Sequence, residues 1–270
     1  MGSGSAQERR QSLIPAALRT ALRPVHAARI VAHARRQRRL VLRELSAPAA
    51  LEPFAARRAL PDGYGVGANE RVIEIPWLLA QGPSGRALDA GSSLNHAEFL
   101  DRLDPLLDEL HIVTLAYEGV AYPQRGVSYA FSDLRALPYR DGYFETVISI
   151  STLEHVGMDN TAYAEGAATA ADPAKETDEA VRELARVLRS GGRLLVTVPY
   201  GEREDHGRFR QFDHADVDRL LEVAQPREAE TVVYRYSHRG WALSDLDEAS
   251  NARYRSDFGA EAVACICMTR

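Results

Sequence analysis

An α/β fold built on one mostly parallel sheet is predicted by three features of the 270-residue sequence. First, short apolar segments alternate with amphipathic segments of helical period, as in consecutive βαβ units. Second, several apolar segments are followed directly by small or polar residues, which is typical of parallel strands whose carboxyl ends face a ligand. Third, the last two apolar segments, 230–236 and 260–268, have no helix between them, so they predict an antiparallel pair at the edge of the sheet.

The elements are expected in the following order. A helix broken near Pro24 covers 13–45, and a connecting segment rich in Ala, Pro and Gly covers 46–69. The helix over 173–189 has Asp172 to cap it, Pro173 at its first position and Gly191 beyond its end. The remaining predictions are helices at 70–81, 95–110 and 216–223 and strands at 86–89, 111–116, 127–131, 144–150 and 193–198. With the final pair, this makes a Rossmann-like, seven-stranded sheet over 70–270, preceded by a basic helical extension and linker over 1–69.

Charge is distributed unevenly along the chain. The net charge is -5, yet the first 60 residues hold twelve Arg and three Glu, and therefore carry +9. One interpretation of the basic helix is a solvated face that packs on the body. Another is a surface that meets anionic lipid or a lipid-linked substrate at a membrane periphery. Nucleic acid is disfavoured, because the rest of the chain is acidic and no aromatic residues interleave with the Arg run.

The two cysteines bear on the redox environment of the protein, and the lengths of its apolar runs bear on whether it spans a membrane. Cys265 and Cys267 lie two positions apart in an expected strand, so they point to the same face and are badly placed to bridge each other. Reduced core cysteines favour a cytoplasmic protein. No run of about 18 apolar residues, the length that spans a bilayer, is present.

The segment 149–160 is the most informative part of the chain. It closes the apolar strand 144–150 and turns abruptly polar, with Ser151, Glu154, His155 and Asn160 close together. Because ligands bind outside the carboxyl ends of such strands, this segment predicts a binding site.

Polar residues also follow the other parallel strands. Asp89-Ala90-Gly91-Ser92 ends the first strand, where a small residue lets the backbone approach a ligand. The turn lacks Gly-x-Gly-x-x-Gly, which argues against a pyrophosphate site. Glu118 follows the second strand, and Asp133-Leu134 follow the third.

Taken in this order, the segments resemble class I S-adenosylmethionine-dependent methyltransferases. The resemblance rests on Asp89 and Gly91, on Asp133, on the run 141–151 with Glu145 where the family usually has Asp, and on Leu188-Arg189-Ser190-Gly191-Gly192. A narrower resemblance, to methyltransferases of bacterial glycan and sugar-bearing natural-product assembly, rests on 70–77, 151–160, 198–201 and 212–213.

The resemblance implies S-adenosylmethionine as the cofactor and assigns roles to these residues. Asp89 would orient the methionine amino end through water or Gly91, with Ala90 and Ser92 in the same turn. Asp133 would accept from the adenine amine and the Leu134 N–H would donate to the ring. Two further residues complete the expected cofactor site: Ser151, and Glu118 on the ribose. Glu118 comes one or two positions late, and a solvated loop carboxylate is the alternative.

The function expected from the resemblance is O-methylation of a sugar hydroxyl in a glycan, glycolipid or glycosylated natural product. His155 is the candidate general base; a contact to donor or substrate and a structural histidine are its alternatives. Residues after the fifth strand would form an acceptor lid or a charged solvent loop: Tyr200, Glu202, Asp205, His206, Arg208 and Arg210. No recognised metal-ligand spacing occurs. An NAD-type Rossmann oxidoreductase and a non-catalytic protein of the same fold are the competing functions. Oligomeric state is not predicted.

Overall fold

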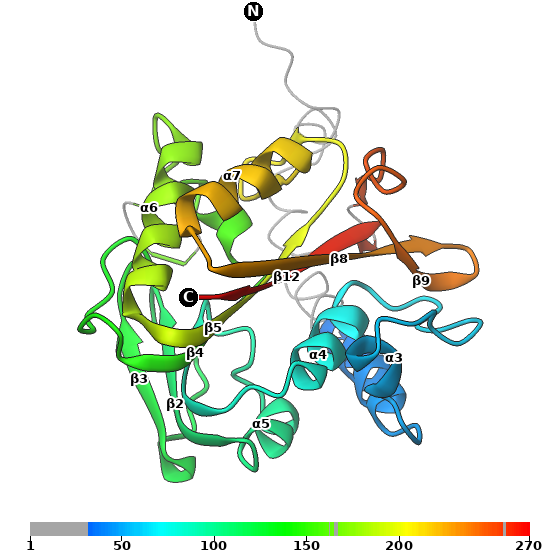
Figure 1. Cartoon of the computed structure of the whole chain (residues 1–270), viewed down its shortest axis with the longest axis horizontal. Helices are drawn as coiled ribbons and strands as arrows, with labels where there is room; N and C mark the ends of the chain where they lie inside the picture. Colours follow the sequence, from blue (N-terminus) through cyan, green and yellow to red (C-terminus); the bar gives the residue numbers. More distant parts are fainter. Residues whose placement is uncertain (1–31, 162, 165–166, 256–257) are drawn as a thin grey trace, which may run out of the picture.

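An eight-stranded sheet runs through the centre of the computed structural model (Figure 1), which describes residues 32–161, 163–164, 167–255 and 258–270. The strand order is β3-β2-β1-β4-β5-β12-β8-β9. The strands of this sheet are β1 (Gly85–Ala90), β2 (Leu107–Thr114), β3 (Val127–Phe131), β4 (Phe144–Ile150), β5 (Leu188–Pro199), β8 (Glu228–Ser237), β9 (Gly240–Ser244) and β12 (Ala262–Thr269).

Strand directions confirm the predicted fold class. The pairs β2–β3, β1–β2, β1–β4 and β4–β5 are parallel, whereas β12 is antiparallel to both β5 and β8. The Rossmann-like α/β fold, with its antiparallel strands at the end of the chain, is therefore correct. The sheet has one strand more than the predicted seven: β9 turns back on β8 through Gly240, whose φ of +100° favours glycine.

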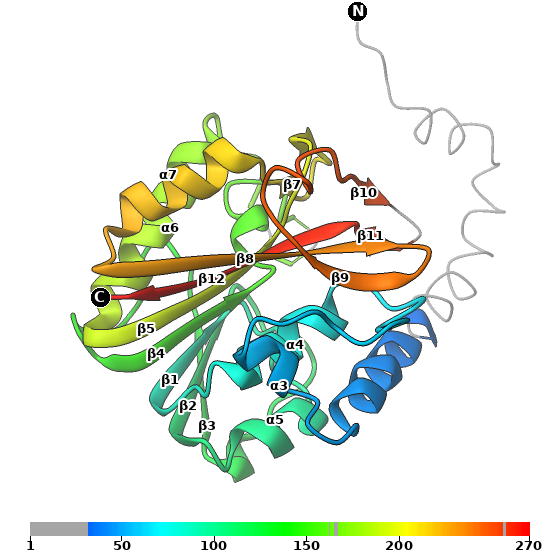
Figure 2. The ribbon, with the colours of Figure 1, turned by 45° about the vertical axis from the view of Figure 1, so that its right-hand side comes forward.

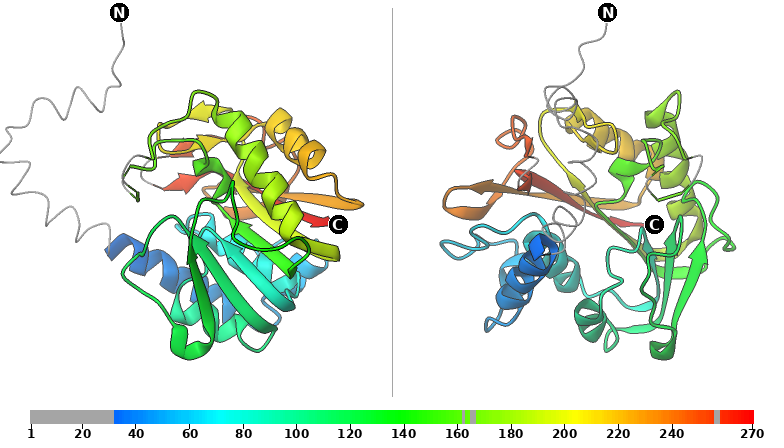
Figure 3. Two further views of the ribbon diagram at one scale, coloured as in Figure 1. Left: turned by 90° about the vertical axis from the view of Figure 1, so that its left-hand side faces the viewer. Right: turned by 180° about the vertical axis from the view of Figure 1, so that it is seen from behind.

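Helices cover both faces of the sheet (Figures 1 and 2). On one face, α6 (Pro173–Val187) and α7 (His214–Ala224) bury Leu184 and Leu220 in one apolar core. On the other face lie α3 (Glu52–Ala55), α4 (Arg71–Ala80), α5 (Ala97–Leu103) and the helix at 32–45, and these elements share a second core with Trp77 and Val41. The side view and the view from behind in Figure 3 show the same layers.

The remaining described elements are short, and four of them form two separate two-stranded sheets, β6–β7 and β10–β11. The short elements are η1 (Pro123–Arg125), η2 (Leu153–His155), β6 (Glu204–Asp205), β7 (Arg210–Gln211), β10 (Tyr254–Arg255) and β11 (Gly259–Ala260). Of the expected helix over 13–45, the part before residue 32 lies outside the described residues. Among the described helices, none has the length and apolar character needed to cross a bilayer.

Two helix ends differ from the predictions for identifiable reasons. The helix expected over 95–110 stops at Leu103, because Pro105 has no N–H to continue it, and β2 already begins at Leu107. At α6, Asp172 caps the start as predicted, accepting from the backbone N–H of Lys175 at 3.2 Å. The helix ends at Val187 rather than Arg189, because Leu188 pairs with Phe144 as the first residue of β5.

Candidate functional site

A cavity of about 280 Å³ lies at the carboxyl ends of β1, β2, β3 and β4. Register aligns these ends, since Ala90 of β1 pairs with Val113 of β2 and Asp89 pairs with Ile148 of β4. Six of the predicted site residues line the cavity: Gly91, Glu118, Asp133, Leu134, Ser151 and His155. The other three, Asp89, Ala90 and Ser92, are buried behind its wall.

Gly91 is required because the turn after β1 lies very close to the turn after β4. Its φ is +121°, and a Cβ built on it would lie 2.1 Å from Oγ1 of Thr152, which follows β4. Thr152 itself lines the cavity. Any side chain at residue 91 would therefore push apart the ends of β1 and β4, where the cavity forms.

Asp89 is fully buried in β1, two residues before Gly91. Its Oδ2 accepts from the backbone N–H of Leu94 at 2.9 Å, while Oδ1 has no hydrogen-bond partner among the described residues. Burial raises the pKa of Asp89 to about 7, with the charge of Glu118 adding to the effect. An acceptor oxygen is thus left unsatisfied beside the Gly91 turn, which suits a ligand that brings a donor.

Glu118 reaches the cavity although it lies four residues beyond the end of β2. Its Oε1 accepts from the Ser92 hydroxyl at 2.6 Å and from the Thr114 hydroxyl at 3.2 Å. Ser92 has a φ of +63°, a conformation uncommon outside glycine, and donates to Glu118 from the turn after β1. The late position in sequence is therefore compensated by a loop that folds back between the first two strands.

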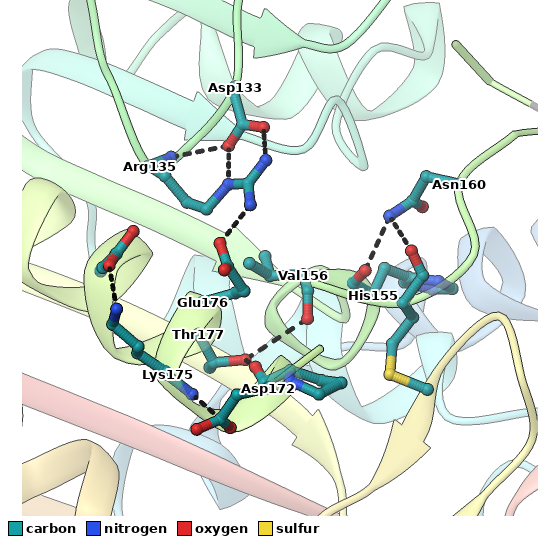
Figure 4. Close-up of polar contacts among 12 residues, drawn as sticks. Asp133, Arg135, His155, Val156, Asn160, Asp172, Lys175, Glu176 and Thr177 are labelled. Carbon is teal, nitrogen blue, oxygen red and sulfur yellow. Dashed lines mark hydrogen bonds and ion pairs between the residues drawn. The ribbon is translucent and has the colours of Figure 1, made fainter. Parts of the chain in front are cut away.

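Asp133 is held by Arg135 in a two-pronged contact (Figure 4). Oδ1 accepts from the backbone N–H and Nε of Arg135 at 2.9 and 2.8 Å, and Oδ2 accepts from the guanidinium at 2.5 Å. Arg135 also pairs with Glu176 of α6. Burial opposes ionisation of Asp133, but the hydrogen bonds from Arg135 outweigh it and hold its pKa below the ordinary value. The carboxylate is ordered and charged before any ligand arrives. Leu134 is buried against the core beside it.

His155 ends the short helix η2 and has a defined tautomer. Its Nδ1 lies 2.8 Å from the backbone carbonyl of Arg208, and a carbonyl only accepts, so Nδ1 carries the proton. Burial lowers the pKa of His155, although the bond to the carbonyl acts in the opposite direction. Asn160 fixes the turn by donating from Nδ2 to the carbonyls of His155 and Met158 at 2.8 and 3.2 Å (Figure 4). Neutral His155 therefore keeps Nε2 free to accept a proton.

Residues after β5 were expected to form an acceptor lid or a charged solvent loop, and four of the six are exposed: Glu202, Asp205, His206 and Arg208. Tyr200 is fully buried, and its hydroxyl donates to the carbonyl of Leu246; Arg210 is also buried and donates to the Thr177 hydroxyl. Neither residue forms part of a rim. Arg208 serves the site through its carbonyl on His155. Within the described ranges, no group of three or more His, Cys, Asp or Glu is placed to hold a metal ion.

Two charged residues of α4 belong to the site but were not expected there. Arg71 lines the cavity, and its guanidinium bonds to Glu74 at 2.5 Å. Glu74 is completely buried, and its other oxygen accepts from the hydroxyls of Ser151 at 2.5 Å and Thr197 at 2.7 Å. One sequence feature could have indicated them. Glu74 stands in an otherwise apolar segment, and a charged residue in a buried helix is expected only where it is paired.

A family model described as "Methyltransferase domain" matches residues 113–196. This segment runs from the end of β2 through β5, and so includes Glu118, Asp133, Ser151 and His155. The chain thus carries a methyltransferase domain match over the part that forms most of the site, in agreement with the predicted S-adenosylmethionine cofactor. No curated protein sequence matches the chain.

Solved structures with related folds have low sequence identity to this chain. The YcgJ protein from Bacillus subtilis is 13% identical, with 73% of this chain and 98% of that chain covered and a TM-score of 0.45. The N-methyltransferase NodS from Bradyrhizobium japonicum is 13% identical, with coverages of 71% and 89% and a TM-score of 0.45. The 1,6-didemethyltoxoflavin-N1-methyltransferase from Burkholderia thailandensis, solved with its substrate and S-adenosylhomocysteine, is 15% identical, with coverages of 100% and 92% and a TM-score of 0.46.

Proposed function

We propose that the chain is an S-adenosylmethionine-dependent methyltransferase that O-methylates a hydroxyl of a sugar-containing small molecule, with His155 as the general base. The single observation that carries this proposal is the fixed tautomer of His155. Its Nδ1 is occupied by the Arg208 carbonyl, so the neutral ring has one basic nitrogen, and the residue lines the cavity beside the end of β4. Residues 70–270 are assigned as the catalytic domain.

The residues at the strand ends fit the donor. Gly91 lets the turns after β1 and β4 meet closely, and the Asp89 Oδ1, which has no partner among the described residues, would hold the ammonium of the methionine tail through water or Gly91. Ala90 and Ser92 complete the turn after β1. Glu118 would accept from the ribose hydroxyls, Asp133 from the adenine amine, and the Leu134 N–H would donate to the ring. Ser151, which begins the turn that leads to His155, would complete the donor site.

The donor, when bound, supplies a methyl group on a positively charged sulfur, and transfer is an in-line displacement. The protein's part is to align the acceptor oxygen with that methyl group away from water, an effect worth several kcal/mol. Nε2 of His155 would take the proton of the acceptor hydroxyl, and general base catalysis of this kind contributes a factor of roughly 100 to 10,000. The Arg208 carbonyl stabilises the imidazolium that results, because it continues to accept from Nδ1.

Calorimetry and turnover test the proposal against its two competitors. S-adenosylhomocysteine should bind and NAD should not; the reverse result would favour an oxidoreductase. Consumption of S-adenosylmethionine with a panel of sugar hydroxyls, amines and carbon acids should then identify the acceptor, whereas binding without any turnover would favour a non-catalytic protein. His155→Gln should reduce turnover about 100-fold or more while donor affinity stays within a few fold. Unchanged turnover would remove the role assigned to His155.

We also propose that the helix at 32–45 contacts anionic lipid at a membrane surface. Arg35 and Arg39 are exposed on this helix, while Val41 and Leu45 on another side of it are buried in the core. Sedimentation with phosphatidylglycerol vesicles should retain the protein at low salt, and Arg35→Glu with Arg39→Glu should release it. Equal sedimentation with phosphatidylcholine would contradict the proposal.

A further inference from the structure

Arg135 leaves Asp133 with one open acceptor position. A carboxylate can accept about four hydrogen bonds, two at each oxygen. Oδ1 of Asp133 accepts two, from the backbone N–H and from Nε of Arg135, at 2.9 and 2.8 Å. Oδ2 accepts one, from the Arg135 guanidinium at 2.5 Å, and no other donor among the described residues contacts this carboxylate. The remaining position therefore lies on Oδ2 of a residue that lines the cavity.

The Arg135 guanidinium is anchored on two sides. Its Nε and Nη2 hold Asp133, while Nη1 donates to the carboxylate of Glu176 in α6 (Figure 4). Glu176 is fixed in its turn, because the start of α6 packs closely on Gly157: a Cβ at that glycine would lie 3.0 Å from Cβ of Glu176. The two carboxylates thus hold the guanidinium in one orientation, and the guanidinium fixes how Asp133 faces the cavity.

The contact between Arg135 and Asp133 matters for the state of the carboxylate more than for folding. Both side chains are 36% exposed, and ion pairs this accessible to water contribute little to stability. Burial opposes ionisation of Asp133, but the hydrogen bonds from Arg135 outweigh burial and hold the pKa of Asp133 below the ordinary value. An ionised carboxylate only accepts, so its open position attracts an N–H donor and repels a carbonyl oxygen.

We propose that Arg135 sets the base specificity of the donor. By fixing Asp133 as an ionised acceptor with one open position, Arg135 selects a purine that carries an amino group over a purine that carries a carbonyl oxygen there. Arg135 is thus a positioning residue for Asp133, and Glu176 is its anchor on α6. This inference rests on the proposed methyltransferase function, which assigns Asp133 to the adenine amine, and adds the residues that make that contact selective.

The test compares two ligands that differ only at the edge of the base. S-adenosylhomocysteine carries the amino group, whereas S-inosylhomocysteine has a carbonyl oxygen in its place and a proton on the adjacent ring nitrogen. Calorimetric Kd values for both are measured on the wild-type protein, which should prefer S-adenosylhomocysteine by roughly 100-fold or more, and on Arg135→Gln. The variant should bind S-adenosylhomocysteine about 10-fold more weakly and S-inosylhomocysteine within about threefold of wild type. Part of the preference should remain, because the Leu134 N–H is unchanged.

Arg125→Gln is the matched control. Arg125 also pairs with two carboxylates, those of Asp101 and Asp104, but it is not among the residues that line the cavity, so its loss should leave both Kd values unchanged. Equal weakening of both ligands by Arg135→Gln would show a merely structural role and overturn the inference, as would unchanged binding of both. A wild-type protein that binds the two ligands equally would overturn it too, whereas one that binds neither would refute the proposed function.

Glu176 is tested by a double-mutant cycle. Glu176→Gln keeps an oxygen for the guanidinium but loses the charge that anchors it, so it should weaken binding of S-adenosylhomocysteine by a smaller factor, roughly 2- to 5-fold, and leave that of S-inosylhomocysteine unchanged. In the Arg135→Gln background, the same substitution should no longer change the ratio of the two Kd values. The same factor in both backgrounds would show that Glu176 does not act through Arg135, and would overturn its role as the anchor.

Discussion

The buried carboxyl group of Glu154 should make the stability of the protein fall as pH rises. Glu154 is 3% exposed, and its Oε2 has no hydrogen-bond partner among the described residues. Burial raises its pKa from 4.5 to about 8, with the neighbouring charge of Glu74 adding to the effect and Arg71 opposing it. In the folded protein this carboxyl group therefore keeps a proton that the unfolded chain has already lost.

The sign and size of the effect follow from proton linkage. Where the folded state binds more protons than the unfolded state, the free energy of unfolding decreases as pH rises. For Glu154 this range extends from the unfolded pKa near 4.5 to the folded pKa near 8. At roughly 1.4 kcal/mol per pKa unit, the loss between pH 5 and pH 8 is on the order of 3 kcal/mol.

Glu154→Gln removes the titrating group and keeps its shape. Urea unfolding, followed by fluorescence of the buried Trp77 and Trp241, gives the free energy of unfolding of both proteins from pH 5 to pH 8. Relative to wild type, the variant should gain on the order of 3 kcal/mol across this range, because its side chain has no proton to lose. Glu222→Gln, at an exposed residue of α7, is the control and should follow the wild-type curve. A constant difference between Glu154→Gln and wild type at every pH would refute the reasoning.

Three further predictions concern the site and the scaffold. Because burial lowers the pKa of His155, the decline of kcat/KM with falling pH should be centred below 6.5; a decline centred above 6.5 in a pH–rate profile would contradict this. Gly91→Ala should destabilise the fold more than Gly119→Ala, since both have positive φ but only the first Cβ meets Thr152; equal melting temperatures would count against the clash. Asp213 caps the start of α7 in a capping box with Asp216. Asp213→Ala should therefore lower the free energy of urea unfolding by about 1 kcal/mol, and no loss would show that the cap is dispensable.

Local signals were sufficient for most of the fold. Strands β3 and β4 have the predicted limits, because each is a short apolar segment between polar turns. Strand β9 was missed, since its five residues are half exposed and are held mainly by pairing with β8. The overlong prediction for α5 followed the apolar period past Pro105 and gave too little weight to the missing N–H.

The candidate site was predictable where its residues follow a strand directly. Gly91, Asp133 and His155 line the cavity because strand direction and register bring the carboxyl ends together. Arg71 and Glu74 could not be placed from spacing, because the contact between Glu74 and Thr197 joins residues 123 positions apart. Such long-range pairing depends on how α4 packs against the sheet, which the periodicity of α4 alone does not specify.

The turn after β4 carries features that stability alone would not favour. Ser151 adopts a left-handed backbone conformation, Glu154 is buried with an unsatisfied oxygen, and the φ of Gly157 is +78°. A Cβ at Gly157 would lie 2.8 Å from Cα of Pro173, so the turn is also fixed against the start of α6. Strain persists only where the surroundings over-determine it, and here Glu74, Asn160 and α6 do so. Because α4 and α6 both fix a costly turn, and Asn160 fixes it from within, the local structure closely defines the position of the His155 imidazole.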